Sequence, residues 1–387
     1  MDDFPGSMYP GHDMLKAIAR RIPGFAALNA RLKARQVKHE YAELVQLYRG
    51  VVPCRLPLPR LTVPPRVLFI GTDEQQDRSG LIQALERAAP LSIFTQEDGR
   101  YGHNDFRAPD IRREANGTRL DRILDQLGRN GELPHLIIAQ TWATLMDPAP
   151  FDRARTCGCL VVNIAMDDRH QFRGRRENGY WAGTLGLIGH IDLALTAAPE
   201  CVEWYEKEGC PALYFPEASD PSIFRPMPEL KKVHDVSFVG GRYGIRERIV
   251  NSLRRAGVRV STYGSGWEEG RIATEDVPAL FAQSKIVLGV GTIGHCDDFY
   301  ALKLRDFDAP MSGTCYLTHD NHDLHGLYDV GTEIAAYSSV DDCVEQVRSL
   351  LADDSRRESI ATAGRARATR DHTWDRRFSE LFLRLSA

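Results

Sequence analysis

Short apolar runs alternate with amphipathic segments along most of the chain, and this pattern predicts an α/β fold. The apolar runs span about four to eight residues and are bounded by turn residues, as in buried parallel strands. In the first half, strands are predicted at 66–71, 91–95, 135–140, 160–166, 191–197 and 212–215, and helices at 81–88, 120–127 and 199–208. Strands that alternate with helices in this way indicate a doubly wound, Rossmann-like sheet.

The second half repeats this alternation after the proline-stiffened stretch Pro216–Pro226 (PEASDPSIFRP). Irregular segments rich in proline are typical of domain boundaries. Strands are predicted at 235–241, 258–263, 285–291, 314–317 and 333–337, and helices at 246–255, 277–284, 301–312, 340–351, 355–369 and 373–385. We therefore expect a second Rossmann-like domain.

The predicted organisation has four parts. Residues 1–60 form a helical extension, residues 61–226 the first domain, residues 227–370 the second domain, and residues 371–387 a C-terminal helix that can pack back on the first domain. Helices are expected at 15–22 and 27–48 of the extension, and both are basic. Two alternatives fit them: packing on the first domain, or a peripheral contact with an anionic membrane surface or a partner.

Composition narrows the function classes. The 387 residues are long enough for two domains, and the net charge of −4 argues against a general nucleic-acid binder. The eight cysteines include no C-x-x-C pair, so the sequence predicts free thiols in a reducing compartment. No apolar run approaches the ~20 residues of a membrane-spanning helix. The expected location is the cytoplasm, or the periphery of the inner membrane face.

The most informative stretch is Tyr300–His319 (YALKLRDFDAPMSGTCYLTH), which follows a polar loop that bears glycine. The predicted helix places Lys303 and Arg305 in its first turn or so. Backbone N–H groups at a helix start and two neighbouring cations together favour a bound diphosphate. Asp308 follows Arg305 by three residues near the same helix face, where a carboxylate can accept hydrogen bonds from two vicinal hydroxyls of a ribose. The alternative is a surface helix with an Arg–Asp pair.

A second glycine-bearing turn extends this candidate site. The predicted strand Asp235–Gly241 (DVSFVGG) ends in paired glycines, which let the backbone approach a ligand closely. Arg242 and Arg246 follow and suit a phosphate, although arginines at a helix start are often only solvated. Tyr263 ends the next strand and can stack on a base, and His295 in the glycine-bearing loop suits a phosphate or a sugar hydroxyl.

The stretch that contains Arg305 resembles the C-terminal signature of GT-B glycosyltransferases, specifically the CgeB-like branch of the group 1 glycosyltransferases. That signature reads approximately L-x-x-R-x-F-E-A-x-A-x-G-x-x-x-L-T. The matching residues here are Leu302, Arg305, Phe307, Ala309, Gly313, Leu317 and Thr318. Asp308 stands where the family has Glu, and Pro310 falls inside the predicted helix, which it should kink or shorten.

The resemblance implies a GT-B fold, in which two Rossmann-like domains face a cleft and the second binds a nucleotide sugar. It also places base-contacting residues near Ser284. Together with the residues above, it gives the predicted donor site: Gly240, Gly241, Arg242, Arg246, Tyr263, Ser284, His295, Lys303, Leu304, Arg305 and Asp308.

Three residues of the first domain are candidates for a general base: Asp168, His190 and His103. Asp168 belongs to an acidic pair that follows a predicted strand, and carboxylates at such a strand end point into a ligand crevice; cap or turn residues are the alternative. His103 lies in the polar segment 96–117, which we predict to be an acceptor-side loop. A base is needed only if transfer inverts the anomeric centre.

The expected function is transfer of a sugar from a nucleotide-diphosphate sugar to an acceptor hydroxyl on a glycan, a small molecule or a protein. No cofactor and no metal are expected, because His319, His322 and His325 do not share one helix face. Two alternatives remain: a GT-B nucleotide-sugar epimerase, and a non-catalytic protein that binds sugar nucleotides.

Overall fold

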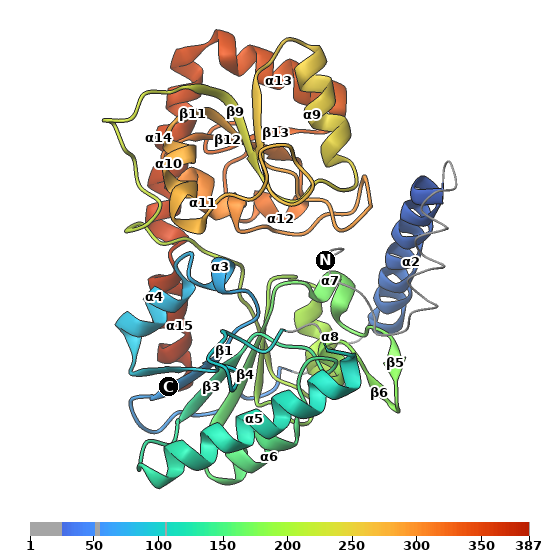
Figure 1. Ribbon diagram of the computed structural model, residues 1–387, viewed down its shortest axis with the longest axis vertical. Coiled ribbons are helices and arrows are strands. Elements are labelled where there is room, and N and C mark those ends of the chain that lie inside the picture. Colours follow the sequence, from blue (N-terminus) through green and yellow to red (C-terminus); the bar gives the residue numbers. More distant parts are fainter. Residues whose placement is uncertain (1–24, 51–54, 105–106, 387) are drawn as a thin grey trace. The chain divides into compact units, whose positions relative to one another are not determined.

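The computed structural model describes residues 25–50, 55–104 and 107–386 of the chain. The chain divides into two compact units (Figure 1). The first unit comprises Met1–Asp77, Ala88–Phe215 and Leu381–Ala387, and the second comprises Arg78–Arg87 and Pro216–Glu380. The helix predicted at 15–22 lies outside the described residues.

A six-stranded parallel sheet with the order β2-β1-β3-β4-β7-β8 forms the first unit. Its strands are β1 (Val67–Ile70), β2 (Leu91–Ile93), β3 (Leu136–Ala139), β4 (Leu160–Ala165), β7 (Leu193–Thr196) and β8 (Ala212–Tyr214). Its other elements are α2 (Phe25–Tyr48), α3 (Glu74–Asp77), α5 (Pro109–Arg129), α6 (Ala149–Thr156), α7 (Asp168–Gln171), β5 (Arg176–Glu177), β6 (Tyr180–Trp181), η1 (Thr184–Leu187) and α8 (Cys201–Lys207). Val67 of β1 lies opposite Leu91 of β2 and Leu136 of β3, so the chain winds in both directions from β1.

A five-stranded parallel sheet with the order β10-β9-β11-β12-β13 forms the second unit. Its strands are β9 (His234–Val239), β10 (Val260–Tyr263), β11 (Ser284–Leu288), β12 (Cys315–His319) and β13 (Ala335–Tyr337). Its helices are α4 (Leu81–Ala88), α9 (Arg246–Arg255), η2 (Thr274–Asp276), α10 (Val277–Ala282), α11 (Arg305–Met311), α12 (His322–His325), α13 (Val340–Ala352), α14 (Asp354–Asp371) and the start of α15 (Trp374–Ser386). The prediction of two Rossmann-like sheets is confirmed.

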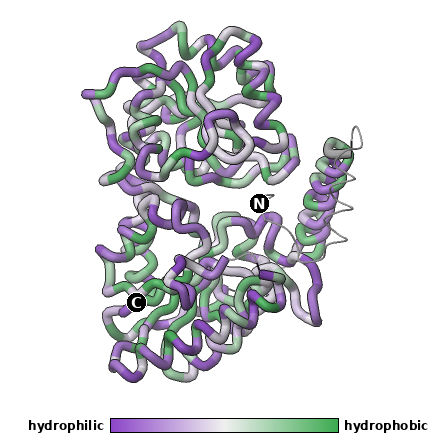
Figure 2. The backbone as a smooth tube through the Cα atoms, in the orientation of Figure 1, coloured by the Kyte–Doolittle hydropathy of each residue, from purple (hydrophilic) through white to green (hydrophobic). Residues whose placement is uncertain are grey.

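Both faces of the second sheet are covered, so apolar residues of its strands are buried on both sides; Figure 2 colours the backbone by hydropathy. Ile286 and Leu288 of β11 belong to a core cluster with α9 and α13. Val287 lies between them in sequence and joins the opposite cluster, which includes Phe307 of α11 and Ala368 of α14. Alternate residues of one strand therefore serve two cores.

One predicted loop is wrong in extent, because α5 begins at Pro109 rather than near residue 120. Proline suits the first position of a helix, where its missing N–H costs nothing. Asn116 and Gly117 interrupt the apolar pattern of this helix because both contact residues outside it. Asn116 Nδ2 donates to the carbonyls of His103 and Leu145, each at 2.7 Å, and Gly117 lets Asp147 approach closely.

Helix α2 packs on the first unit through its last turns. Leu44 and Tyr48 are buried, and the Tyr48 ring stacks on Trp204 of α8 at a centroid distance of 5.5 Å. Tyr41 Oη donates to Glu200 of α8 at 3.0 Å. The expected helix 27–48 is therefore confirmed, and part of it is bound to the first unit.

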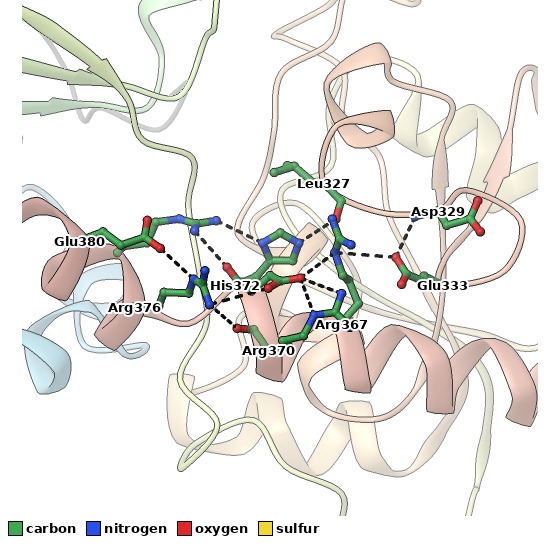
Figure 3. Close-up of polar contacts among 10 residues, drawn as sticks. Leu327, Asp329, Glu333, Arg367, Arg370, His372, Arg376 and Glu380 are labelled. Atoms are coloured by element: carbon green, nitrogen blue, oxygen red, sulfur yellow. Dashed lines mark hydrogen bonds and ion pairs between the residues drawn. The ribbon is translucent and has the colours of Figure 1, made fainter.

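A buried histidine joins α14 to α15 within the second unit (Figure 3). Burial lowers the pKa of His372 to about 4, so the imidazole is neutral. Its Nε2 lies 2.8 Å from the Leu327 carbonyl and its Nδ1 lies 3.2 Å from Arg377 Nη2. Because arginine only donates, Nδ1 accepts and the proton is on Nε2. Neighbouring arginines, among them Arg367 and Arg370, pair with Asp371 at the end of α14.

Gly364 allows α14 to pack closely against the segment before β13. A Cβ at this position would lie 2.3 Å from the Glu333 carbonyl oxygen. We expect Gly364→Ala to lower the free energy of unfolding by about 1–3 kcal/mol, because backbone must shift to relieve the clash. Gly128→Ala in α5 is the matched control, since its Cβ meets only the Leu133 side chain at 3.7 Å. Equal midpoints of chemical unfolding for the two variants would contradict the close packing of α14.

Candidate functional site

The turn after β9 lies at the point where the strand order of the second sheet reverses, between β9 and β11. In open α/β sheets, ligands bind outside the carboxyl ends of the strands at this point. Gly240 has a φ of 153°, and an added Cβ would lie 3.1 Å from Phe238 Cζ. A Cβ at Gly264, after β10, would lie 2.4 Å from the Gly240 carbonyl oxygen. Neither position has room for a side chain, so the turn stays tight.

Two arginines converge on this turn. A Cβ at Gly240 would lie 3.2 Å from Arg305 Nη1 and 3.4 Å from Arg246 Nη1. Arg246 is the first residue of α9 and is 4% exposed, and its Nη1 donates to the Gly241 carbonyl at 3.0 Å. Arg305 is the first residue of α11, and its Nη1 donates to the Val239 carbonyl at 2.5 Å. Across the described residues, neither arginine has an ion pair with a carboxylate.

In the described residues, backbone carbonyls and aromatic rings contact these two guanidinium groups, and no carboxylate lies within ion-pair distance. Burial, and then the charge of Arg305, lowers the pKa of Arg246 to about 10, which still leaves it protonated at neutral pH. The Arg246 guanidinium lies 3.9 Å from the Tyr243 ring centroid, and that of Arg305 lies 5.1 Å from the Phe238 centroid. Aromatic faces stabilise cations only in part. A buried like-charge pair is costly, so this arrangement favours a bound anion.

Other buried polar groups at the same sheet edge have no hydrogen-bond partner among the described residues. In the part of the chain that the structure describes, the buried atoms without a hydrogen-bond partner include Arg246 Nε, Arg305 Nε and Nη2, Thr292 Oγ1 and Asn321 Nδ2. Thr292 follows β11 and Asn321 follows β12, so both come from the carboxyl ends of adjacent strands. Such orphaned groups are rare in folded proteins, and a ligand with many oxygen atoms would satisfy them.

Helix α11 is shorter than the predicted helix 301–312 and spans only Arg305–Met311. Lys303 precedes it, and Leu304 is its N-cap residue. Asp306 accepts a 2.7 Å hydrogen bond from the Lys303 amide, and the amides of Asp306, Phe307 and Asp308 bond to the carbonyls of Lys303 and Leu304. Several amides of this helix start are therefore already bonded within the chain, and binding of an anion by the helix start stays a prediction.

Asp308 is enclosed rather than open to solvent. It is 4% exposed, and its Oδ1 accepts a 2.6 Å hydrogen bond from Ser219 Oγ. Burial raises the pKa of this carboxyl well above its usual range, against the opposing influences of Ser219 and Arg305. The structure thus brings Asp308 onto the helix of Arg305, as the sequence predicts, and bonds it to the segment that precedes β9. Its contact with a ribose stays a prediction.

Of the remaining predicted donor residues, Tyr263 and His295 lie near the turn after β9, whereas Arg242 is engaged in an exposed ion pair. Tyr263 ends β10 at the same sheet edge as Gly240, and His295 lies 6.2 Å from Tyr243, ring to ring. Arg242 is exposed and ion-paired with Glu247, whose carboxylate raises the pKa of Arg242.

Ser284 lies away from the predicted site. It is fully buried at the amino end of β11, where its hydroxyl lies 2.7 Å from that of Ser237. The site lies beyond the carboxyl end of this strand, so the geometry does not support direct contact of Ser284 with a donor.

His319 lies at the same sheet edge, although the sequence analysis names it only in a metal site that is not expected. It ends β12 and its ring lies between Tyr300 and Tyr337, with centroid distances of 5.2 Å and 4.4 Å. Burial, and then the charge of Arg246, lowers the pKa of His319 to about 4. Tyr337 Oη donates to the Gly289 carbonyl at 2.7 Å and lies 3.1 Å from His319 Nδ1, so Nδ1 carries the proton and Nε2 is an acceptor.

Asp168 lies at the carboxyl edge of the first sheet and is 1% exposed. Its Oδ1 accepts hydrogen bonds from Thr184 Oγ1 at 2.7 Å and Tyr205 Oη at 3.0 Å. Burial raises its pKa to about 7. The residue therefore holds the segment 168–184 closed at its base.

The two candidate histidines lie at opposite edges of the first sheet. His103 is fully buried, and its Nδ1 lies 2.5 Å from the Gly71 carbonyl, just beyond β1. His190 precedes β7 at the amino edge, where its Nδ1 lies 2.8 Å from Asp152. The structure brings His103 and Asp168 to one edge and separates His190 from both.

The described residues contain no group of three or more His, Cys, Asp or Glu side chains that could hold a metal ion. No helix among them combines the length and apolarity that crossing a membrane requires.

Residues 245–382 match the sequence model of a family described as "Glycosyl transferase-like". This segment contains Arg246, His295, Lys303, Arg305 and Asp308. No curated protein matches the chain at a significant level.

Solved structures match most of the chain. Sucrose-phosphate synthase from Thermosynechococcus elongatus has a TM-score of 0.57 at 12% identity, over 82% of this chain and 98% of that one. Anabaena HepE in complex with UDP has a TM-score of 0.54 at 11% identity, over 82% and 99%. AviGT4, a glycosyltransferase involved in avilamycin A biosynthesis, has a TM-score of 0.54 at 15% identity, over 84% and 98%.

This chain has the GT-B fold. The resemblance to GT-B glycosyltransferases is confirmed by these structures together with the family match in the second unit. The CgeB-like branch stays a prediction. The segment that matches the glycosyl transferase-like family lies almost entirely within the second unit and contains both arginines.

The raised pKa of Asp168 predicts a pH-dependent stability. The unfolded carboxyl titrates near 3.8 and the folded one near 7, so its favourable contribution is complete below 3.8 and is lost as the pH rises through 7. We expect Asp168→Asn to flatten this decline, because the amide can still accept from Thr184 and carries no charge. Unfolding midpoints measured from pH 4 to pH 8 provide the test, and an unchanged slope would contradict a neutral buried carboxyl.

Proposed function

We propose that this protein transfers a sugar from a nucleotide-diphosphate sugar to an acceptor hydroxyl. One observation carries the proposal: Arg246 and Arg305 converge on Gly240 with three N–H positions unpaired and no counter-ion in the described residues. A diphosphate has the charge and the oxygen atoms that this cradle lacks. Thr292, Asn321 and His319 offer further polar contacts along the same edge.

The arginines suit the chemical step as well as binding. Cleavage of the bond between sugar and diphosphate leaves negative charge on the departing phosphate oxygen. Guanidinium groups fixed before the reaction stabilise that charge without reorganising. Arg246 is held by Tyr243 and Gly241, and Arg305 by Val239 and Phe238. We therefore propose departure assisted by protein cations, with Lys303 as a third, in a reaction that requires no metal.

The first unit is proposed to hold the acceptor. If the reaction inverts the anomeric centre, a base is required, and Asp168 and His103 lie at the ligand-binding edge of that unit's sheet. Asp168 has the better matched pKa, about 7, although it must exchange its bond with Thr184 for one with an acceptor. His190 lies at the other edge, so we do not assign it this role. A retaining reaction would need neither residue as a base.

Two experiments on the wild-type chain separate this proposal from the alternatives. A thermal-shift screen of nucleoside diphosphates and their sugars identifies the donor base, with uridine compounds first because HepE was solved with UDP. Incubation of the stabilising nucleotide sugar without an acceptor then tests the epimerase, which would convert the sugar. A sensor would bind the nucleotide sugar yet transfer nothing across a panel of acceptors.

Arg305→Met should weaken nucleoside diphosphate binding about 10- to 100-fold, because it removes charge-assisted hydrogen bonds of about 1.5–3 kcal/mol. It should also preserve or raise the melting temperature, because it relieves the repulsion with Arg246. Calorimetry with the nucleotide from the screen gives the affinity. Arg248→Met, an exposed position on the same unit, is the charge-matched control. Unchanged affinity in Arg305→Met would exclude the cradle as the diphosphate site.

Asp308→Ala should weaken binding of the same nucleotide roughly tenfold, consistent with loss of a hydrogen bond to a ribose hydroxyl. Ser219→Ala removes the only partner of Asp308 Oδ1 that the structure shows and tests a purely structural role. We expect Ser219→Ala to retain affinity. If the two variants lose affinity equally, Asp308 acts by holding α11 and not by touching the ribose.

A further inference from the structure

A short hairpin in the first unit carries arginines that the donor site does not use. We name residues 173–183 the arginine hairpin; it contains β5, β6 and the turn Asn178–Gly179. Asn178 has a φ of 40° and Gly179 a φ of 92°, as in the type I′ turns that suit two-residue hairpins. The hairpin is thus specified locally by its sequence.

The base of the arginine hairpin is fixed to the ligand-binding edge of the first sheet. The Ala143 and Thr144 amides, which follow β3, donate to the Gly183 and Ala182 carbonyls at 3.3 Å and 3.0 Å. Asp168, which follows β4, accepts from Thr184 immediately beyond the hairpin. The hairpin therefore rises from the carboxyl ends of two adjacent strands, where α/β sheets bind ligands.

Two charges of this hairpin lack an ion-pair partner. Arg175 and Arg176 are exposed, and within the described ranges neither side chain has an ion pair or a hydrogen bond. The one acid of the hairpin, Glu177, instead accepts from Thr144 Oγ1 at 3.3 Å and Tyr180 Oη at 3.4 Å. Two open cations are notable in a chain whose net charge is −4.

The Trp181 ring contacts the guanidinium groups of Arg176 and Arg173. Arg176 lies 5.6 Å from the Trp181 ring centroid, and Arg173 lies 5.5 Å from the same ring. Arg173 also pairs with Glu43 of α2 at 2.7 Å, which stiffens one side of the hairpin. A guanidinium that is ordered by a ring keeps its N–H fork available for a carboxylate or a phosphate, and loses less entropy on binding it.

We propose that the arginine hairpin binds an anionic glycan, and that this glycan is the acceptor. The inference rests on the proposed sugar transfer, because the hairpin lies at the ligand-binding edge of the unit assigned to the acceptor. The shared chemistry of the ligand is a carboxylate or phosphate group on a sugar chain, bound by Arg175 and Arg176.

The test uses the full chain and three defined glycans: oligogalacturonate with carboxylates, a phosphomannan oligosaccharide with phosphodiesters, and neutral cellohexaose. We expect the wild type to bind at least one anionic glycan and not the neutral one, with affinity that falls as salt rises. Arg175→Gln/Arg176→Gln should weaken that binding at least about tenfold. Arg129→Gln/Arg384→Gln removes two other exposed charges from the first unit and should leave it unchanged. The preferred anionic glycan identifies the acceptor anion.

Several results would overturn the proposal: equal affinity for cellohexaose, no binding of either anionic glycan, an equal loss in both double variants, or binding of anionic phospholipid vesicles in place of glycans. Nucleoside diphosphate affinity is measured on the same samples. If it is unchanged in Arg175→Gln/Arg176→Gln while glycan binding falls, the hairpin acts on the acceptor alone. If the wild type binds no nucleotide, the proposed sugar transfer fails independently of the glycan result.

Discussion

The candidate site of the second unit is organised by the electrostatic repulsion between Arg246 and Arg305, which no ion pair among the described residues offsets. Arg246 and Arg305 are held beside Gly240 by carbonyl oxygens and aromatic rings, and within the described residues neither has a carboxylate to pair with. Folding alone would select against this pair, because hydrophobic residues would fill the same space at lower cost. Its presence at the reversal point of the sheet is best explained by an anionic ligand. The tight glycine turn, the neutral His319 and the shortened α11 all place polar groups around the same edge.

Most of the fold can be predicted from the sequence, because most helices and strands have a clear local pattern of apolar and turn residues. Buried parallel strands are short apolar runs, and α9 and α4 appear with the bounds that the periodicity predicts. The predictions that failed depend on tertiary contacts. The start of α5 was missed because the helix contains a buried asparagine and a glycine, which contact His103, Leu145 and Asp147 outside the helix. Hairpin β5–β6 was recognisable from Asn178–Gly179, a strong local turn signal, although only two residues pair on each side.

The charged residues of the candidate site could be predicted from the sequence, but the contacts of several of its residues could not. Arg305 and Arg246 follow from the resemblance and from the glycine turn, and the structure brings them together. Spacing along a helix could not reveal that Asp308 bonds to Ser219. The predicted strand 285–291 already placed Ser284 at its amino end, and only the resemblance put base contacts there. Thr292, Asn321 and His319, which we propose as ligand contacts, were not among the predicted donor residues. The signal for them was available, since each lies at or just beyond the carboxyl end of a predicted strand.

The last turns of α15 belong to the first unit, although the helix begins in the second. The Leu385 carbonyl accepts a 2.6 Å hydrogen bond from the Leu61 amide, and both side chains are buried. The first unit therefore joins two segments that lie far apart in the sequence, and its folding requires both of them. A substitution that disrupts the last turns of α15 would also release the segment that leads into β1.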